Sequence, residues 1–259
     1  MEIEQNWQNY RSMIKEKVAI FSVNLTLFQC YQKTQATHRT ILQFSLPYVA
    51  EENGLPQTED YQSLLKEMLR LSTLLSAQPQ SVYVGYMLSD KQATLYFYCQ
   101  DTAPLKAVLA DFEQVINVSE QQDPNWDIYF DFLLPSPLEM KINATEEILD
   151  MLIQNGRSLD MTYLIEHTFH FPEEENMYLF LEYVATHNIS VLTLKHTGIP
   201  IPLDEEERAF IVKLEQEVNL SGTDIFKYVE QFEEISSQFS GEYIGWESQE
   251  LAWDKTQLN

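Results

Sequence analysis

The chain has 259 residues, and its hydrophobic content of 44%, with 14 tyrosines and 14 phenylalanines, excludes a disordered protein and provides enough apolar side chains for two cores. Its 40 acidic residues outnumber its 16 basic residues and give a formal net charge of −24, which argues against direct contact with nucleic acid or an anionic membrane. No stretch approaches the roughly 20 apolar residues that span a bilayer, and the opening MEIEQNWQNY lacks the features of a signal peptide, so we expect a cytoplasmic protein.

The first half begins with alternating apolar and polar residues, which predict a half-buried strand over residues 18–28. A second strand is expected over residues 38–48. Thr58 is expected to cap a helix that begins at Glu59, because hydroxyl side chains favour the cap position and acids favour the first turn. The apolar face of this helix is predicted to consist of Tyr61, Leu64, Leu65, Met68, Leu69 and Leu75.

A hairpin follows, with the strands SVYVGYML and ATLYFYCQ, and we expect it to turn at Ser89 and Asp90. Pro104 is expected to start another helix, and a short strand is expected over residues 115–118. The half ends in the aromatic segment DPNWDIYFDFLLP. The prolines of the next segment, residues 135–137, cannot continue a helix or a central strand, so we predict a boundary there. It separates a domain of residues 1–138 from a domain of residues 139–259.

The second half is predicted to follow the order helix, strand, helix, two strands, helix and strand. Asn143 and Ser221 are the expected caps of its first and last helices. The expected elements are a helix from Asn143 to Gly156, a strand over 161–171, a helix from Pro172 to Asn188, strands near 190–197 and 209–218, a helix from Ser221 to Gly241, a strand from Tyr243 to Trp246, and a loose tail from Leu251 to Asn259.

Both halves therefore contain the order strand, helix, strand, strand, helix, strand, with additions. This order is typical of a split βαβ sandwich, in which two helices cover one face of an antiparallel sheet. We predict an α+β protein made of two ferredoxin-like antiparallel sandwich domains.

Glu166, His167 and His170 form the sharpest cluster of reactive side chains. Residues an odd number apart project from opposite faces of a strand, so His167 and His170 should not act together. Glu166 and His170 share a face but lie roughly 13 Å apart at about 3.3 Å per residue. We expect a structural role for these groups. An unrecognised enzyme with a site at Glu166 and His170, or with the aromatic segment lining a cleft, is the open alternative.

The sequence contains neither the ligand spacing of a zinc or calcium site nor the motifs of phosphate-binding loops and nucleophile elbows. We therefore predict no catalytic residue, no cofactor and no metal, and we expect Cys30 and Cys99 to be reduced thiols. Two acidic clusters remain: we expect the first to complement a helix N-terminus and the second to be a solvated loop, with a surface that binds a basic partner as the alternative. The candidate partner-binding residues are Glu173, Glu174, Glu175, Asp204, Glu205, Glu206 and Glu207.

The segments ILDMLIQNGRSLDMTYLIEHTFHF and GEYIGW, with the helix and paired strands between them, resemble the family of the regulator of ribonuclease activity B. This resemblance covers residues of about 142–250. Residues 1 to about 138 resemble an uncharacterised bacterial domain family through the Trp7–Tyr10 segment, Gly54–Pro56, YVGYML, LYFYCQD and DPNWDIYFDFLLP.

The first resemblance implies a small acidic protein of ferredoxin-like fold. It also implies a regulatory role, because the best-described member of that family binds the endoribonuclease E and modulates RNA cleavage without being an enzyme. Together with the acidic composition, it predicts a non-enzymatic regulator that binds a basic segment of a protein partner through an acidic surface, without touching nucleic acid or membrane. A structural module that self-associates through exposed sheet aromatics is the other alternative.

Overall fold

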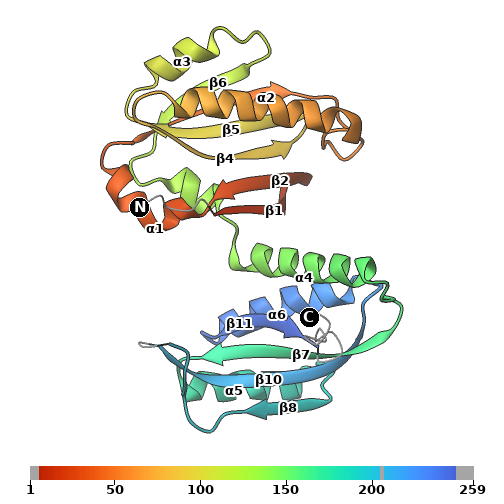
Figure 1. The fold of residues 1–259 in the computed structure, drawn as a ribbon. Helices are drawn as coiled ribbons and strands as arrows, with labels where there is room; N and C mark the ends of the chain where they lie inside the picture. The colour runs from red at the N-terminus through yellow and green to blue at the C-terminus, as the bar shows by residue number, and fades with distance from the viewer. Residues whose placement is uncertain (1–5, 205–206, 249–259) are drawn as a thin grey trace, which may run out of the picture. The chain divides into compact units, whose positions relative to one another are not determined.

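The computed structural model describes residues 6–204 and 207–248. The chain divides into two compact units, residues 1–139 and residues 140–259 (Figure 1). Each unit combines one antiparallel sheet with helices, and this arrangement confirms the predicted α+β class.

The first unit is built on a six-stranded sheet whose neighbouring strands are all antiparallel. In spatial order its strands are β1 (Trp7–Ile14), β2 (Lys17–Asn24), β4 (Ser81–Ser89), β5 (Gln92–Cys99), β3 (Thr40–Pro47) and β6 (Ile116–Gln122). Helix α2 (Thr58–Ser76) connects β3 to β4, and α3 (Ala103–Leu109) connects β5 to β6. The order β4-β5-β3-β6 is that of a ferredoxin-like sandwich, and the β1–β2 hairpin extends the sheet beyond β4.

Both faces of this sheet are covered, whereas the sequence predicted helices on one face. Helices α2 and α3 cover a core that contains Leu42, Phe44 and Phe97. The opposite face is covered by α1 (Thr26–Gln35) and by the π-helical segment η1 (Ile128–Leu133). The aromatic segment of the sequence thus closes a second core, in which the main contributors are the fully buried Trp126, Tyr129 and Leu133.

Two elements at the start of the chain were not predicted. Strand β1 lies at the sheet edge and buries only Tyr10, so its residues lack a strong apolar alternation. The strand expected over residues 18–28 ends at Asn24, and α1 follows it. The side chain of Asn24 accepts a hydrogen bond from the Thr26 backbone N–H at 3.0 Å, and this local turn competes with continuation of the strand.

The predicted cap and face of α2 were partly wrong. Thr58 is the first residue of the helix, and the preceding Gln57 makes no side-chain capping bond. The buried stripe is Leu64, Met68, Leu71, Ser72 and Leu75. Leu69 is 67% exposed because it lies off this stripe. The β4–β5 hairpin turns at Asp90 and Lys91, one residue later than expected, and both have positive φ, as a two-residue hairpin turn requires.

The second unit has a five-stranded sheet in the ferredoxin-like order. Its main path is β11 (Glu242–Glu247), β7 (Thr162–Phe171), β10 (Arg208–Asn219) and β8 (Thr193–His196), and β9 (Ile201–Pro202) pairs with the start of β10. Helices α5 (Glu174–Thr186) and α6 (Asp224–Gln238) are the two crossovers, and α4 (Pro137–Gln154) precedes the sheet.

One face of β7 builds the core, as its alternation predicted. The odd-numbered residues from Tyr163 to Phe171 are buried, and the even-numbered ones are half-buried or exposed. Phe169 packs against Phe180 of α5 and Phe232 of α6, with ring centroids 4.7 and 5.3 Å apart. The two helices therefore cover the same face, and the even-numbered side chains of β7 belong to the other face of the sheet.

The expected caps of the outer helices in this half were wrong. Helix α4 begins at Pro137, and Ser136 and Glu139 form its capping box, with Ser136 N–H donating to the Glu139 carboxylate at 2.8 Å and Glu139 N–H donating to the Ser136 hydroxyl at 3.2 Å. Asn143 is buried inside the helix. Helix α6 begins at Asp224, and the Ser221 hydroxyl bonds the Asn219 side chain instead. The tail expected from Leu251 to Asn259 lies outside the described residues.

Candidate partner-binding surface

The two acidic clusters flank the second sheet at the same end: the first follows β7, and the second precedes β10. Glu173 occupies the cap position of α5, with Glu174 and Glu175 in its first turn, and all three are exposed. This placement agrees with the expected attraction between carboxylates and a helix N-terminus. Asp204 and Glu207 precede β10 and are also exposed, while Glu205 and Glu206 lie outside the described residues.

The strand register explains why these segments are neighbours. Phe210 pairs with Phe171, so the chain that enters β10 and the chain that leaves β7 run side by side. A hollow of about 500 Å³ opens at this end, and its lining includes Pro172, Leu203 and Glu207. We call Glu173–Glu175, Asp204 and Glu207 the acidic end of the sheet.

His170 lines the same hollow, together with Arg208 and Glu242. Partial burial lowers the pKa of His170, and the nearby Glu242 carboxylate acts in the opposite direction. His170 is paired with Glu242 of β11 and Ile211 of β10 in the strand register, whereas Glu166 lies on the same face of β7 further from this end. The structure therefore does not bring Glu166 and His170 together.

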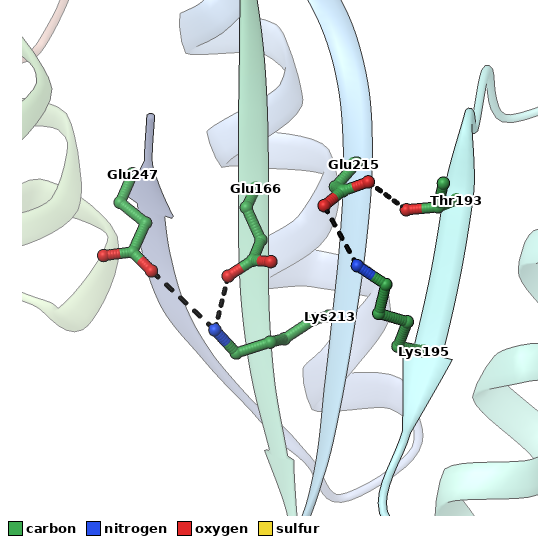
Figure 2. Close-up of polar contacts among 6 residues, drawn as sticks. All are labelled: Glu166, Thr193, Lys195, Lys213, Glu215 and Glu247. Atoms are coloured by element: carbon green, nitrogen blue, oxygen red, sulfur yellow. Dashed lines mark hydrogen bonds and ion pairs between the residues drawn. The ribbon is translucent and has the colours of Figure 1, made fainter. Parts of the chain in front are cut away.

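Glu166 belongs to a row of charges on the face of the sheet that α5 and α6 do not cover, the same face as His170 (Figure 2). Lys213 of β10 bonds the Glu166 carboxylate and lies 3.8 Å from that of Glu247 on β11. The hydrogen bond to Glu166 is the main reason why the pKa of Lys213 is raised. Glu166 is thus occupied as an ion-pair partner, and its position gives no support to a role as a general acid or base.

The row continues toward β8. Glu215 accepts a hydrogen bond from the Thr193 hydroxyl and lies 3.3 Å from Lys195 (Figure 2). These contacts, the Thr193 bond first, lower the pKa of Glu215. Sequence reasoning missed this row. The alternation of residues 208–219 places Lys213 and Glu215 outward, but only the register brings them beside Glu166 and Lys195.

The outward positions of β7 and β10 give no support to self-association through exposed sheet aromatics. Apart from His170, the outward side chains of the two strands are aliphatic, hydroxyl, amide or charged. They are Thr162, Leu164, Glu166, Thr168 and His170 on β7, and Ile211, Lys213, Glu215, Glu217 and Asn219 on β10.

His167 points into the core, on the opposite face from His170, as the alternation predicted. It is fully buried between the Tyr243 hydroxyl, 2.8 Å from Nδ1, and the Gln216 amide oxygen, 3.2 Å from Nε2. Burial lowers the pKa of His167 to about 3, against a smaller opposing effect of Gln216. The neutral ring therefore joins β7 to β11 and β10 as a buried polar link.

The rings of the aromatic segment pack in the core of the first unit and give no support to a cleft lined by them: Trp126 and Tyr129 are fully buried, and Phe130 and Phe132 are half-buried. The Trp126 indole N–H donates to the His38 carbonyl at 2.8 Å. The Asp123 carboxylate accepts hydrogen bonds from the Tyr98 hydroxyl and from two backbone N–H groups at the start of η1. These contacts hold the segment on the sheet, so they indicate a structural role in the core of the first unit.

Across residues 6–204 and 207–248, no three His, Cys, Asp or Glu side chains gather in a way that could hold a metal ion. Cys30 and Cys99 are free thiols. Over the same residues, no helix combines the length and apolar character needed to cross a membrane.

Comparison with known proteins divides the chain in the same way. Residues 5–134, half of the chain, match the model of a family of unknown function (DUF695). Residues 142–248 match the family described as regulator of ribonuclease activity B. No curated protein matches the chain. The chain therefore belongs to the family of unknown function DUF695, and its second domain is one of the regulator of ribonuclease activity B family.

Proposed function

We propose that this chain is a non-enzymatic cytoplasmic protein that regulates an endoribonuclease of the E type by binding a basic segment of that enzyme. We assign the binding to the second domain, residues 139–259, and within it to the acidic end of the sheet. Glu205 and Glu206 belong to the same acidic run in the sequence. The first domain, residues 1–138, has no part in this proposal.

The observation that carries the proposal is the convergence of two acidic segments in a domain of a ribonuclease-regulator family. Glu173–Glu175 are far from Asp204 and Glu207 in the sequence, but the register of β7 and β10 brings these residues to one end of the sheet. Clustered exposed carboxylates attract a cationic segment over several ångströms and raise the rate of encounter.

The charge of the chain supports binding to the enzyme and argues against binding to its RNA substrate. A protein that holds RNA needs lysines or arginines against the phosphates. Here acidic residues outnumber basic ones by 40 to 16. Arg208 is the basic residue in the lining of the hollow at the acidic end, where Glu207 and Glu242 accompany it.

The test is a binding titration between the full chain and purified endoribonuclease E, at low and at physiological salt. The variant E173Q/E174Q/E175Q removes three exposed charges while keeping the side-chain shapes. A matched control, E147Q/D150N/E230Q, removes three exposed charges from α4 and α6. At about 0.5 kcal/mol for each exposed ion pair, the first variant should bind roughly tenfold more weakly.

We expect the control to bind like the unmodified chain and the affinity to fall steeply with salt. If the two variants weaken binding equally, the effect is not specific to the acidic end, and the assignment of the binding surface to it is wrong. Binding that is absent, or that does not respond to salt, would contradict the proposal. RNA that is bound or cleaved by the chain alone would also contradict it.

A further inference from the structure

A groove of about 750 Å³ lies in the first unit, between the second half of α2 and the part of the sheet formed by β1, β2 and β4. Its walls come from β1, β2, the start of α1, the second half of α2, and β4. None of the described residues that line it is charged. This is unusual in a chain where 22% of the residues are charged, and the volume falls in the range of about 300–1,000 Å³ that is common for small-molecule sites.

Two aromatic rings form part of the sheet wall. Trp7 of β1 and Tyr83 of β4 have centroids 5.4 Å apart and planes inclined at 41°. Both rings line the groove, and Trp7 pairs with Asn24 of β2, so the three side chains belong to one face of the sheet. Such rings offer flat apolar surfaces against which the ring of a ligand can pack.

A buried hydroxyl group beside these rings lacks a partner among the described residues. The Ser81 hydroxyl oxygen is buried and makes no hydrogen bond in the described part of the chain. Asn24 is 6% exposed, and its side-chain oxygen accepts from the Thr26 N–H, but its amide nitrogen donates to none of the described residues. A buried polar group without a partner costs roughly 1–3 kcal/mol, so a ligand that supplies hydrogen bonds here would be favoured.

We propose that this groove binds the pyranose ring of an uncharged carbohydrate. The ring packs on Trp7 and Tyr83, and its hydroxyl groups bond the Asn24 amide and the Ser81 hydroxyl. Ser81 and Tyr83 project from the same side of β4, about 6.6 Å apart at roughly 3.3 Å per residue, so one ring can reach both.

The chemistry of the described lining argues against charged ligands and against purely apolar ones. Among the described lining residues, a phosphate or carboxylate would meet no lysine or arginine, and a cation would meet no carboxylate. A purely apolar ligand would leave the buried Ser81 hydroxyl without a partner. A neutral ligand that carries both an apolar ring face and hydroxyl groups satisfies the rings and the polar groups together.

The test is an NMR titration of the full ¹⁵N-labelled chain with glucose, maltose, cellobiose and N-acetylglucosamine. We expect at least one sugar to shift the Trp7 indole and the Ser81 and Tyr83 amides along a saturating curve. The variant S81A should weaken that binding about five- to tenfold, the cost of one buried hydrogen bond. The variant L69K places a long charged side chain at an exposed lining position and should weaken it at least tenfold.

The control is M13K, because Met13 is 60% exposed on β1 and is not part of the lining. The spectra of all three variants also report whether the fold is kept. If no sugar shifts these signals, or if L69K and M13K bind equally well, the proposal is wrong. If adenosine or uridine shifts them while the sugars do not, the assignment to carbohydrate is wrong.

Discussion

His167 should make the second domain less stable in mild acid. The ring is fully buried with a pKa of about 3, whereas a histidine in an unfolded chain titrates near 6.5. Between these two values the unfolded chain binds a proton that the folded chain excludes. The contribution of the neutral His167 ring to the free energy of unfolding is therefore fully present above pH 6.5, and it is lost as the pH drops from 6.5 toward 3.

The size of this effect follows from about 1.36 kcal/mol for each pH unit. From pH 6.5 to pH 4.5, two units, His167 should remove about 2–3 kcal/mol from the free energy of unfolding. In the variant H167Q the side chain stays neutral at every pH, although it loses the ring contact with Phe232, whose centroid lies 4.7 Å away. H167Q should be the less stable protein at pH 7, and its deficit should shrink by about 2–3 kcal/mol at pH 4.5.

Two measurements check this expectation. Urea unfolding at pH 7 and at pH 4.5 gives the difference in the free energy of unfolding between the unmodified chain and H167Q. The carboxylates contribute almost equally to both proteins, so their contribution largely cancels in this difference. An NMR titration of the histidine ring signals, with H167Q to assign the His167 signal, shows directly whether the ring stays neutral at pH 4.5. A His167 ring that titrates near pH 6, or a deficit that does not change with pH, would refute the reasoning.

Three further predictions concern stability. Lys213 and Glu166 should show a coupling of about 0.5–1 kcal/mol in a double-mutant cycle with K213Q and E166Q, and a coupling near zero would mean that the charge row is not formed in solution. S136A should destabilise α4 by about 1 kcal/mol, measured by amide hydrogen exchange in its first turns, and unchanged exchange would contradict the capping box. L71A should cost about 2–5 kcal/mol in urea unfolding and L69A close to nothing, and similar costs would contradict the observed buried face of α2.

The sequence was most informative where apolar and polar residues alternate regularly along a single strand or helix. The alternation from Thr162 to Phe171 predicted strand β7 and correctly placed His167 and His170 on opposite faces. The order of elements predicted both ferredoxin-like sheets. These features depend on local periodicity and on the rule that neighbouring elements pack together, and both can be read from one chain.

Other features depend on contacts between distant residues and were missed. Lys213 meets Glu166 only because β10 and β7 pair in one particular register. Strand β1 is an edge strand with one buried residue, so its sequence shows little alternation. The cap of α4 was placed at Asn143 because Asn143 and Glu146 have the spacing of a capping box, yet the true box, Ser136 and Glu139, lies one segment earlier. The signal for the observed box is local, a Ser-x-x-Glu pattern with Pro137 at the first helical position, and it was missed because the prolines of residues 135–137 were interpreted only as a domain boundary.

The covering of the first sheet by η1 has a consequence for synthesis of the protein. Trp126, Tyr129 and Leu133 are the last core residues of the first unit, and they close over Phe21 and Tyr98, which are made about a hundred and about thirty residues earlier. Until residues 126–133 have left the ribosome, this side of the sheet is covered only in part, by α1. Nascent chains halted just before Trp126 should therefore recruit chaperones, and chains halted far enough beyond Leu133 for this segment to leave the exit tunnel should no longer need them.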